Sequence, residues 1–220
     1  IDELNAIEKK YEAKNTGNLD KKKEDSKSEL DKKAEDAKKE IDTLPNLTDD
    51  EKQKAKDEID QKIKDGKDAI DQGTKPKDVE DAKNTTDTKV KDIVDQSTLQ
   101  DAKNKARKDL EAKADETKKA IDALPGISKE AKDKAKAMID SILKKGYQSI
   151  DSSDYLYEIE RYVQNSIKDM HKVLESLNKK ESDLGPLGVN DSHTPAIGAL
   201  IAIFGLAFTL FDRKKYFLKK

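Results

Sequence analysis

The amino-acid sequence predicts an all-α protein in which tandem three-helix bundles form an elongated rod, followed by one C-terminal transmembrane helix. Three observations predict this fold class: a long segment of the chain recurs once, apolar residues recur at helical spacing, and an uncharged apolar run stands near the C-terminus. Residues 1–183 hold only 14 Ile, 12 Leu and 5 Val and no Phe. Large aliphatic residues at about 17% are too few for a thick core. Long helices whose narrow apolar stripes meet along a seam are the ordered alternative.

The repeat is the strongest of these observations. Residues 30–71 match residues 110–151 without a gap, at 19 of 42 positions, and the shift that places Leu30 over Leu110 is called the repeat offset. Shared Lys and Asp follow easily from biased composition, whereas shared Pro, Gly and Ile at one offset do not. The informative pairs are Leu30/Leu110, Ile41/Ile121, Pro45/Pro125, Ile59/Ile139, Gly66/Gly146, Ile70/Ile150, Val79/Ile159, Val90/Met170 and Ile93/Val173. The predicted organisation is the end of a truncated preceding repeat at 1–18, helical repeats at 19–97 and 98–178, and a linker at 179–195.

Each repeat is expected to contain three helices. In the first repeat, apolar residues step by four and three from Leu30 to Leu44, as in a coiled-coil seam. Pro45 ends this helix because proline disfavours helical geometry in the residue before it. Thr48 followed by Glu51 predicts a capping box that starts the second helix. In the second copy Ser128 retains the cap without the reciprocal Glu.

Two features of the helices have alternative interpretations. Gly66, inside the second helix, allows either a close approach of another helix or a kink. The third helix follows the break at 72–76, and no Gly or Pro occurs between Lys77 and Leu124. This third helix therefore either continues into the next repeat as one rod or pauses at Ser97 and Thr98, which can cap a new start. Both alternatives give bundles stacked end to end.

The charges are numerous but balanced. The 45 Lys and Arg face 47 Asp and Glu, so 42% of the residues are charged while the net charge is -2. A nucleic-acid-binding domain needs an uncompensated basic surface, so we expect no nucleic-acid partner. Acid-to-Lys pairs at i, i+4, such as Glu29/Lys33 and Asp109/Lys113, are expected to stabilise exposed helix faces by about 0.2–0.5 kcal/mol each.

The last helix of the second repeat differs from its counterpart in the first. It holds Tyr155, Tyr157 and Tyr162, which are half of all the tyrosines. These tyrosines form either a contact surface for a partner or part of a terminal repeat with a reinforced core, and we favour the second interpretation. The helix also has a stronger apolar stripe, made of Leu156, Ile159, Val163, Ile167, Met170, Leu174 and Leu177.

The C-terminus predicts a membrane anchor at residues 196–211. This uncharged run, as a helix, reaches about 24 Å, somewhat short of a hydrocarbon core of about 30 Å. It spans the membrane if Thr194, Tyr216 and the flanking basic side chains reach the interfaces, or if the bilayer thins. A buried core helix is the alternative. The apolar residues of the anchor are Ala196, Ile197, Leu200, Ile201, Ile203, Phe204, Leu206, Phe208, Leu210 and Phe211. A basic tail at 212–220, predicted to be cytoplasmic by the positive-inside rule, carries Arg213, Lys214, Lys215, Lys219 and Lys220.

The sequence contains little material for catalysis. It has no Cys and only two His, His171 and His193, which lie in different segments. No phosphate-cradling loop, nucleophile elbow, zinc spacing or calcium-loop spacing occurs. We therefore expect no enzyme activity, no cofactor and no metal site.

Three local patterns carry a resemblance to a known family: LPNLT at 44–48, Glu-Lys-x-x-Ala-Lys at 51–56, and Ala-Ile-Asp at 69–71. Over roughly residues 19–178 the chain resembles the tandem helical repeats of Gram-positive surface proteins of the extracellular-matrix-binding adhesin type. The resemblance implies a spectrin-like rod on a bacterial surface, used for adhesion, aggregation or wall organisation.

The C-terminus also resembles the sorting signal of sortase substrates, in which a recognition motif precedes an apolar run and a basic tail. Residues 184–195 contain no Leu-Pro-x-Thr-Gly, however. Three alternatives stay open: a noncovalent membrane anchor, a variant sortase, and ordinary sorting through another motif. Covalent sorting would add peptidoglycan to the membrane as a partner.

The leading functional hypothesis is a cell-surface rod, the C-terminal piece of a longer protein, that projects an adhesive region away from its anchor. In a second hypothesis the repeats themselves bind host matrix or plasma proteins. In a third, the chain is a tail-anchored intracellular scaffold. The sequence upstream of Ile1 distinguishes the third from the others, because a signal peptide excludes it and an initiator Met favours it.

Overall fold

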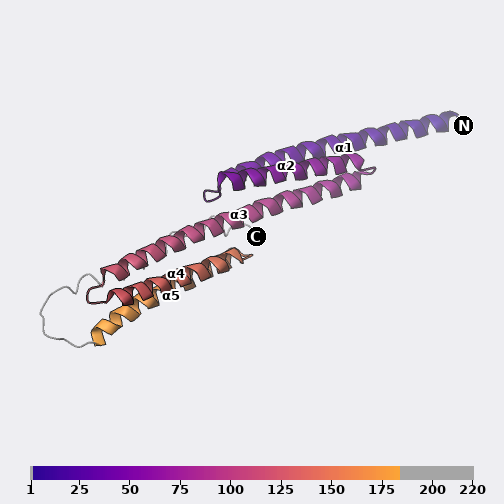
Figure 1. The fold of residues 1–220 in the computed structure, drawn as a ribbon. Helices are drawn as coiled ribbons and strands as arrows, with labels where there is room; N and C mark the ends of the chain where they lie inside the picture. The colour runs from indigo at the N-terminus through magenta and orange to yellow at the C-terminus, as the bar shows by residue number, and fades with distance from the viewer. Residues whose placement is uncertain (1, 184–220) are drawn as a thin grey trace. The chain divides into compact units, whose positions relative to one another are not determined.

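The computed structural model describes residues 2–183, and these residues are all-helical, without a strand, as predicted (Figure 1). The chain divides into two compact units, the first ending at Asn104 and the second beginning at Lys105. The helices are α1 (Asp2–Asp42), α2 (Asp49–Gln72), α3 (Pro76–Ala123), α4 (Lys129–Asp151) and α5 (Leu156–Asp183).

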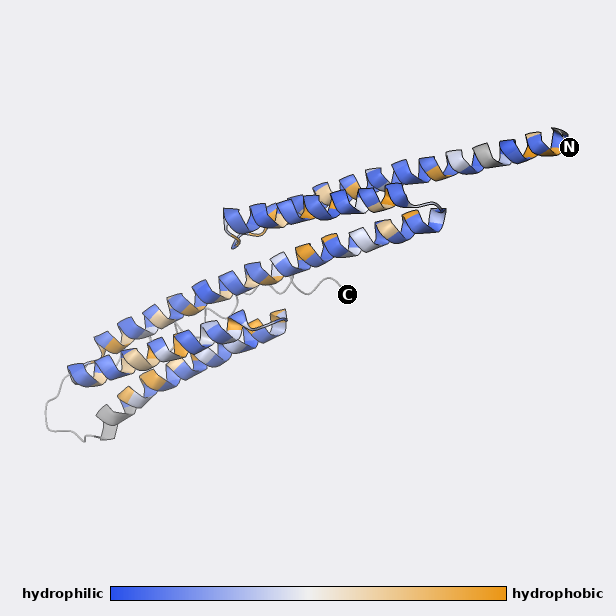
Figure 2. Ribbon diagram, turned by 45° about the vertical axis from the view of Figure 1, so that its right-hand side comes forward, coloured by the Kyte–Doolittle hydropathy of each residue, from blue (hydrophilic) through white to orange (hydrophobic). Residues whose placement is uncertain are grey.

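The first unit is built from α1, α2 and the beginning of α3. Figure 1 shows α1 and α2 side by side, joined by the short loop that contains Pro45. Apolar bands on otherwise hydrophilic helices (Figure 2) supply a thin core. The core residues are Leu30, Ala34, Ala37, Ile41, Leu44, Leu47, Ala55, Ile59, Ile63, Ile70, Val79, Val90, Ile93 and Val94.

Burial follows the predicted repeat. Equivalent positions of the two repeats are buried in both units, and each member of the following pairs is at most 1% exposed: Leu30/Leu110, Ile41/Ile121, Ile59/Ile139, Ile70/Ile150, Val79/Ile159 and Val90/Met170. The predicted apolar repeat is therefore also a repeat of core positions. Ile159, Val163, Met170, Leu174 and Leu177 of the α5 stripe are buried as well, which agrees with a reinforced core in the second repeat.

The helix boundaries agree with the local sequence signals. α1 ends at Asp42, before Pro45. Thr48 Oγ1 accepts the backbone N–H of Glu51 at 3.2 Å, and Glu51 Oε2 accepts the backbone N–H of Thr48 at 2.8 Å, which completes the predicted capping box. Ser128 Oγ accepts the N–H of Ala131 at 3.2 Å and caps α4 alone.

α3 decides between the two alternatives for the third helix. It runs as one helix of 48 residues from Pro76 to Ala123, so the alternative with a pause at Ser97 and Thr98 is wrong. Their hydroxyls donate to the carbonyl oxygens of Ile93 and Val94 one turn earlier, at 2.8 and 2.9 Å. The side chains therefore bond within the helix and do not cap a new one.

The buried glycines permit close helix packing. A Cβ on Gly66 would lie 2.2 Å from Thr86 Oγ1 of α3, and a Cβ on Gly146 would lie 2.5 Å from Leu110 Cδ2. α2 and α4 continue through these positions without interruption. The close-approach interpretation of Gly66 is confirmed.

Many ion pairs join different helices, which the i, i+4 prediction did not anticipate. Glu29, predicted to pair with Lys33, lies 3.0 Å from Lys83 Nζ of α3. Asp109, predicted to pair with Lys113, lies 2.5 Å from Lys105 Nζ one turn earlier on the same helix. Pairs between α1 and α2 recur between α3 and α4 at the repeat offset: Lys38 with Asp60 and Lys118 with Asp140, Lys56 with Asp42 and Lys136 with Asp122. Each pair has one well-exposed partner, so its contribution to stability is small.

The predictions for the C-terminal part of the chain, from residue 179 on, are only partly covered by the described residues. The anchor at 196–211 and the basic tail at 212–220 lie outside the described residues. α5 continues to Asp183, into the segment predicted as a linker from residue 179, since no Gly or Pro occurs before Gly185. Within residues 2–183, no helix is sufficiently long and apolar to cross a membrane.

Asp78 gives the first unit a pH dependence that can be measured. Its Oδ2 accepts the backbone N–H groups of Thr74 at 3.1 Å and Lys75 at 2.9 Å, just before α3. The bond from Thr74 is the main cause that lowers the pKa of Asp78 below 3.8. A lowered folded-state pKa stabilises the fold above the unfolded-state value, and this stabilisation is lost as the pH falls through the folded-state value. We expect Asp78→Asn to destabilise the first unit more at pH 7 than at pH 3.

Urea unfolding of the native protein and of Asp78→Asn, at pH 7 and at pH 3, measures the loss of stability at each pH. Glu58→Gln, at an exposed position in the middle of α2, is the control for a simple loss of negative charge. An equal loss of stability for Asp78→Asn at pH 7 and pH 3 would contradict a lowered pKa of Asp78 in the folded state.

Candidate functional site

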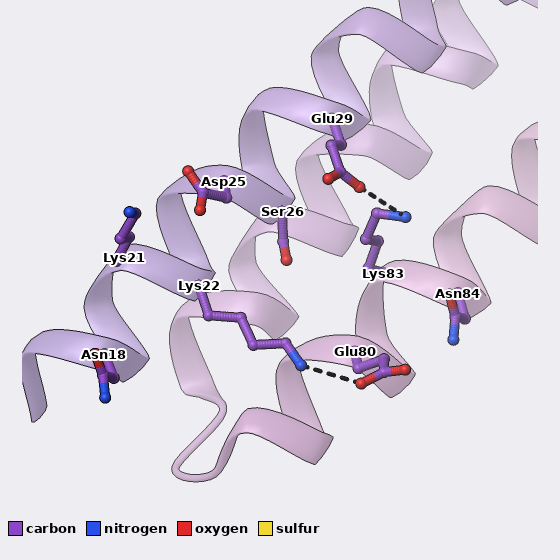
Figure 3. Close-up of a pocket in the computed structure, with 9 residues that line it drawn as sticks. All are labelled: Asn18, Lys21, Lys22, Asp25, Ser26, Glu29, Glu80, Lys83 and Asn84. Carbon is purple, nitrogen blue, oxygen red and sulfur yellow. Dashed lines mark hydrogen bonds and ion pairs between the residues drawn. The ribbon is translucent and has the colours of Figure 1, made fainter. Parts of the chain in front are cut away.

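A polar groove lies between α1 and α3 in the first unit (Figure 3). It is open to solvent and lined by side chains of both signs. The lining residues are Asn18, Lys21, Lys22, Asp25, Ser26, Glu29, Glu80, Lys83 and Asn84.

Ion pairs across the groove neutralise two of its cations. Lys22 Nζ lies 3.0 Å from Glu80 Oε2, and Lys83 Nζ lies 3.0 Å from Glu29 Oε2, so the two lysines reach across in opposite directions (Figure 3). Lys83 also lies 3.1 Å from Asp87. The hydrogen bonds with Glu29 and then Asp87 raise the pKa of Lys83. The groove thus resembles a solvated interhelical contact more than a binding site for an anion or a reacting group.

The same place in the second repeat has a different chemistry. At the repeat offset, Ala102, Ala106 and Val163 stand where the groove has Lys22, Ser26 and Lys83. These three residues are 2%, 0% and 7% exposed. The polar groove is therefore a feature of the first repeat and not of the repeat in general.

A second polar cluster binds the α1–α2 loop to α3. Asp101, fully buried, accepts the backbone N–H of Asn46 at 2.6 Å and its Nδ2 at 3.3 Å. Asn104 Nδ2 donates to the carbonyl oxygen of Asn46 at 3.1 Å and to Glu51 Oε2 at 2.9 Å. Sequence analysis missed Asp101 and Asn104. No local signal marks them, because most residues between Ser97 and Leu110 are polar.

Two of the three predicted contact tyrosines come together. Tyr155 and Tyr157 are 59% and 61% exposed, and their rings stack with centroids 5.6 Å apart. Tyr162 is half-buried, and the guanidinium of Arg161 lies 5.2 Å from its ring centroid. Partner contact through Tyr155, Tyr157 and Tyr162 stays a prediction.

Residues that commonly bind metals are dispersed. Among residues 2–183, no group of three or more His, Asp or Glu side chains is placed to hold a metal ion. His171 Nδ1 lies 3.5 Å from Glu175 Oε1 on the same helix, and His193 lies outside the described part of the chain.

The fold and these surfaces define an all-α protein of tandem repeats, in which equivalent positions form two thin cores and one helix takes part in both repeats. The family described as Domain of Unknown Function (DUF1542) matches residues 22–98 and residues 102–176, which together make up more than half of the chain. The chain therefore belongs to this family. Comparison with curated proteins finds no match, and neither does comparison with solved structures.

Proposed function

We propose that this chain is part of a non-enzymatic bacterial cell-surface stalk, which projects an adhesive region away from a C-terminal anchor and so contributes to adhesion or aggregation. The observation that carries the proposal is α3, a single helix that takes part in two consecutive repeats of one family. A repeat that shares a helix with the next one adds length without enlarging the core.

The physical properties of the repeats support this role. A helix of 48 residues is about 72 Å long at 1.5 Å per residue, so a series of shared helices would form an elongated rod. Interleaved Lys, Asp and Glu keep such a core-poor protein soluble, and cross-helix pairs such as Lys118 with Asp140 recur from repeat to repeat. A stalk needs reach and solubility, and it needs no enclosed pocket.

The proposal of a membrane anchor at residues 196–211 rests on the sequence alone. Residues 196–211 are apolar, and a basic tail follows them, which is the order expected for a helix that enters a membrane from outside. The membrane is then the partner of this segment. Peptidoglycan becomes a second partner if a sortase acts on residues 184–195.

Topology can be tested directly because these 220 residues contain no cysteine, and any cysteine elsewhere in the longer protein is first replaced by serine. Two single-cysteine variants of the full-length protein, Glu58→Cys in the first repeat and Lys215→Cys in the tail, are treated in intact cells with a membrane-impermeant maleimide. We expect the cysteine at position 58 to be labelled on intact cells and the cysteine at position 215 only after lysis. Protection of position 58 until lysis would refute the surface stalk and favour the intracellular scaffold.

A further inference from the structure

The loop of the first repeat is held by residues that stand at the start of the second. The first family match ends at residue 98 and the second begins at residue 102. Asp101 directly precedes the second match, and Asn104 lies inside it. Both side chains bond to the loop that joins α1 and α2, far earlier in the chain.

The two surfaces are complementary in hydrogen-bonding chemistry. The loop presents two donors, the backbone N–H and Nδ2 of Asn46, and both are accepted by the carboxylate of Asp101. Two acceptors lie beside these donors, the carbonyl oxygen of Asn46 and the carboxylate of Glu51 in the first turn of α2, and both accept from Nδ2 of Asn104. A carboxylate and an amide one helical turn apart therefore match the loop group by group. Because Asp101 is fully buried, a mismatch there would leave polar groups without water or a partner.

The first repeat itself opens with the opposite chemistry. At the repeat offset, Lys21 stands at the position of Asp101 and Glu24 at the position of Asn104. A Lys ammonium has only donors, so it would face the two donors of Asn46. A Glu carboxylate has only acceptors, so it would face the carbonyl oxygen of Asn46 and the carboxylate of Glu51. An α1-type helix start is thus mismatched to this loop at both positions.

The loop of the second repeat lacks the side chains that make these contacts. Gly126 replaces Asn46 and adopts a positive φ of 69°, and Ala131 replaces Glu51. Leu47 in the first loop is 7% exposed, whereas the equivalent Ile127 is only half-buried. The cap on the following helix is kept in both loops, so the difference concerns the outward-facing contact and not the start of the helix.

We propose that the α1–α2 loop with Asn46, together with the first turn of α2 with Glu51, forms a selective docking loop, which accepts a following repeat only if that repeat opens with a carboxylate and an amide at the positions of Asp101 and Asn104. The four side chains then help to determine which repeats can be neighbours, since an α1-type start would place like groups opposite each other. A repeat that opens like α1 is rejected by this loop. The inference goes beyond the stalk function and does not depend on it.

The test transplants the α1 pair into α3 of the full-length chain, as Asp101→Lys with Asn104→Glu. The readout is the hydrogen-exchange rate of the Asn46 backbone amide, which reports on the loop alone. Because a hydrogen bond to a charged group is lost, we expect exchange to accelerate by about tenfold or more. The matched control makes the reverse change, Lys21→Asp with Glu24→Asn, and should leave exchange at Asn46 unchanged.

A conservative variant separates a lost docking contact from a general loss of folding. Asp101→Asn keeps an oxygen that can accept the Asn46 N–H, so its exchange rate should lie between those of the native chain and the double variant. The backbone amide of Ile59, in the core of the first unit, reports on the stability of that unit and should accelerate much less than the amide of Asn46 in all variants. Native exchange at Asn46 in the double variant would overturn the proposal. Equal acceleration at Asn46 and Ile59 would also overturn it, because the four side chains would then act only on the stability of the first unit.

Discussion

Replacing Ile59 by alanine is expected to lower the free energy of unfolding of the first unit by about 2–5 kcal/mol. Ile59 is fully buried at the centre of the cluster formed by α1, α2 and α3. This core consists of only a few Ile, Leu, Val and Ala side chains, so few neighbours can move to fill the cavity. Small domains are stable by only about 5–15 kcal/mol, and the loss would thus be a large fraction of the total.

Hydrogen exchange combined with urea unfolding measures this effect in each unit separately, which matters because repeat proteins need not unfold in a single step. Met138→Ala is the control: Met138 also lies on a second helix of a repeat, but it is 54% exposed. Its substitution should change stability by no more than about 0.5 kcal/mol. Similar losses for Ile59→Ala and Met138→Ala would show that the buried stripe is not the main source of stability.

Substituting Gly66 by alanine is expected to destabilise the first unit by about 1–3 kcal/mol through overpacking. The added Cβ would lie 2.2, 2.7 and 2.9 Å from Oγ1, Cγ2 and Cβ of Thr86. Thr86 is 3% exposed, and its hydroxyl donates to the carbonyl oxygen of Ala82 at 2.9 Å, so it cannot easily move away. Helix propensity works in the opposite direction, because Ala is favoured over Gly by about 1 kcal/mol, and an overall loss therefore indicates a steric clash.

Two other glycines provide matched comparisons for thermal or urea unfolding. A Cβ on Gly17 would meet nothing within 4 Å, so Gly17→Ala should be neutral or stabilising by up to about 1 kcal/mol. A Cβ on Gly146 would meet Leu110 Cδ2, the end of a flexible side chain, at 2.5 Å and Ser166 Oγ at 2.8 Å. Gly146→Ala should therefore cost less than Gly66→Ala. A stabilising Gly66→Ala would contradict the close packing of α2 on α3.

Helix boundaries and core positions could be read from the amino-acid sequence because their causes are local. Pro45 acts on the residue before it, and Thr48 and Glu51 are one turn apart, so their effects require no knowledge of the rest of the fold. The repeat offset also predicted the pairs of buried positions, since the apolar residue of one copy supports the assignment of the other. The sequence left two alternatives for α3. The absence of Gly and Pro allowed one continuous helix, but Ser97 and Thr98 are suitable both for a cap and for the middle of a helix.

The candidate surfaces were less accessible to prediction. The tyrosines were identified, but their division into an exposed stacked pair and a half-buried Tyr162 depends on the packing of α5. The docking loop was missed because Asn46 and Asp101 lie far apart in the sequence and both are ordinary residues for their local positions. Burial of the Asp101 carboxylate, which makes the contact selective, has no signature in a chain with 47 acidic residues.

The helices, their ends, the repeat and its apolar stripe are properties of the sequence, because each arises from residues within a turn or two, or from a pattern that recurs. The tertiary structure was needed to determine which charged side chains form ion pairs with each other. Lys83 has acidic neighbours along its own helix, yet it also pairs with Glu29 of α1, and Asp101 bonds to a loop. Forty-five basic and 47 acidic side chains allow many alternative pairings of similar energy. Which of these pairs meet depends on how the helices pack, and a close approach such as that of Gly66 to Thr86 is visible only in the tertiary structure.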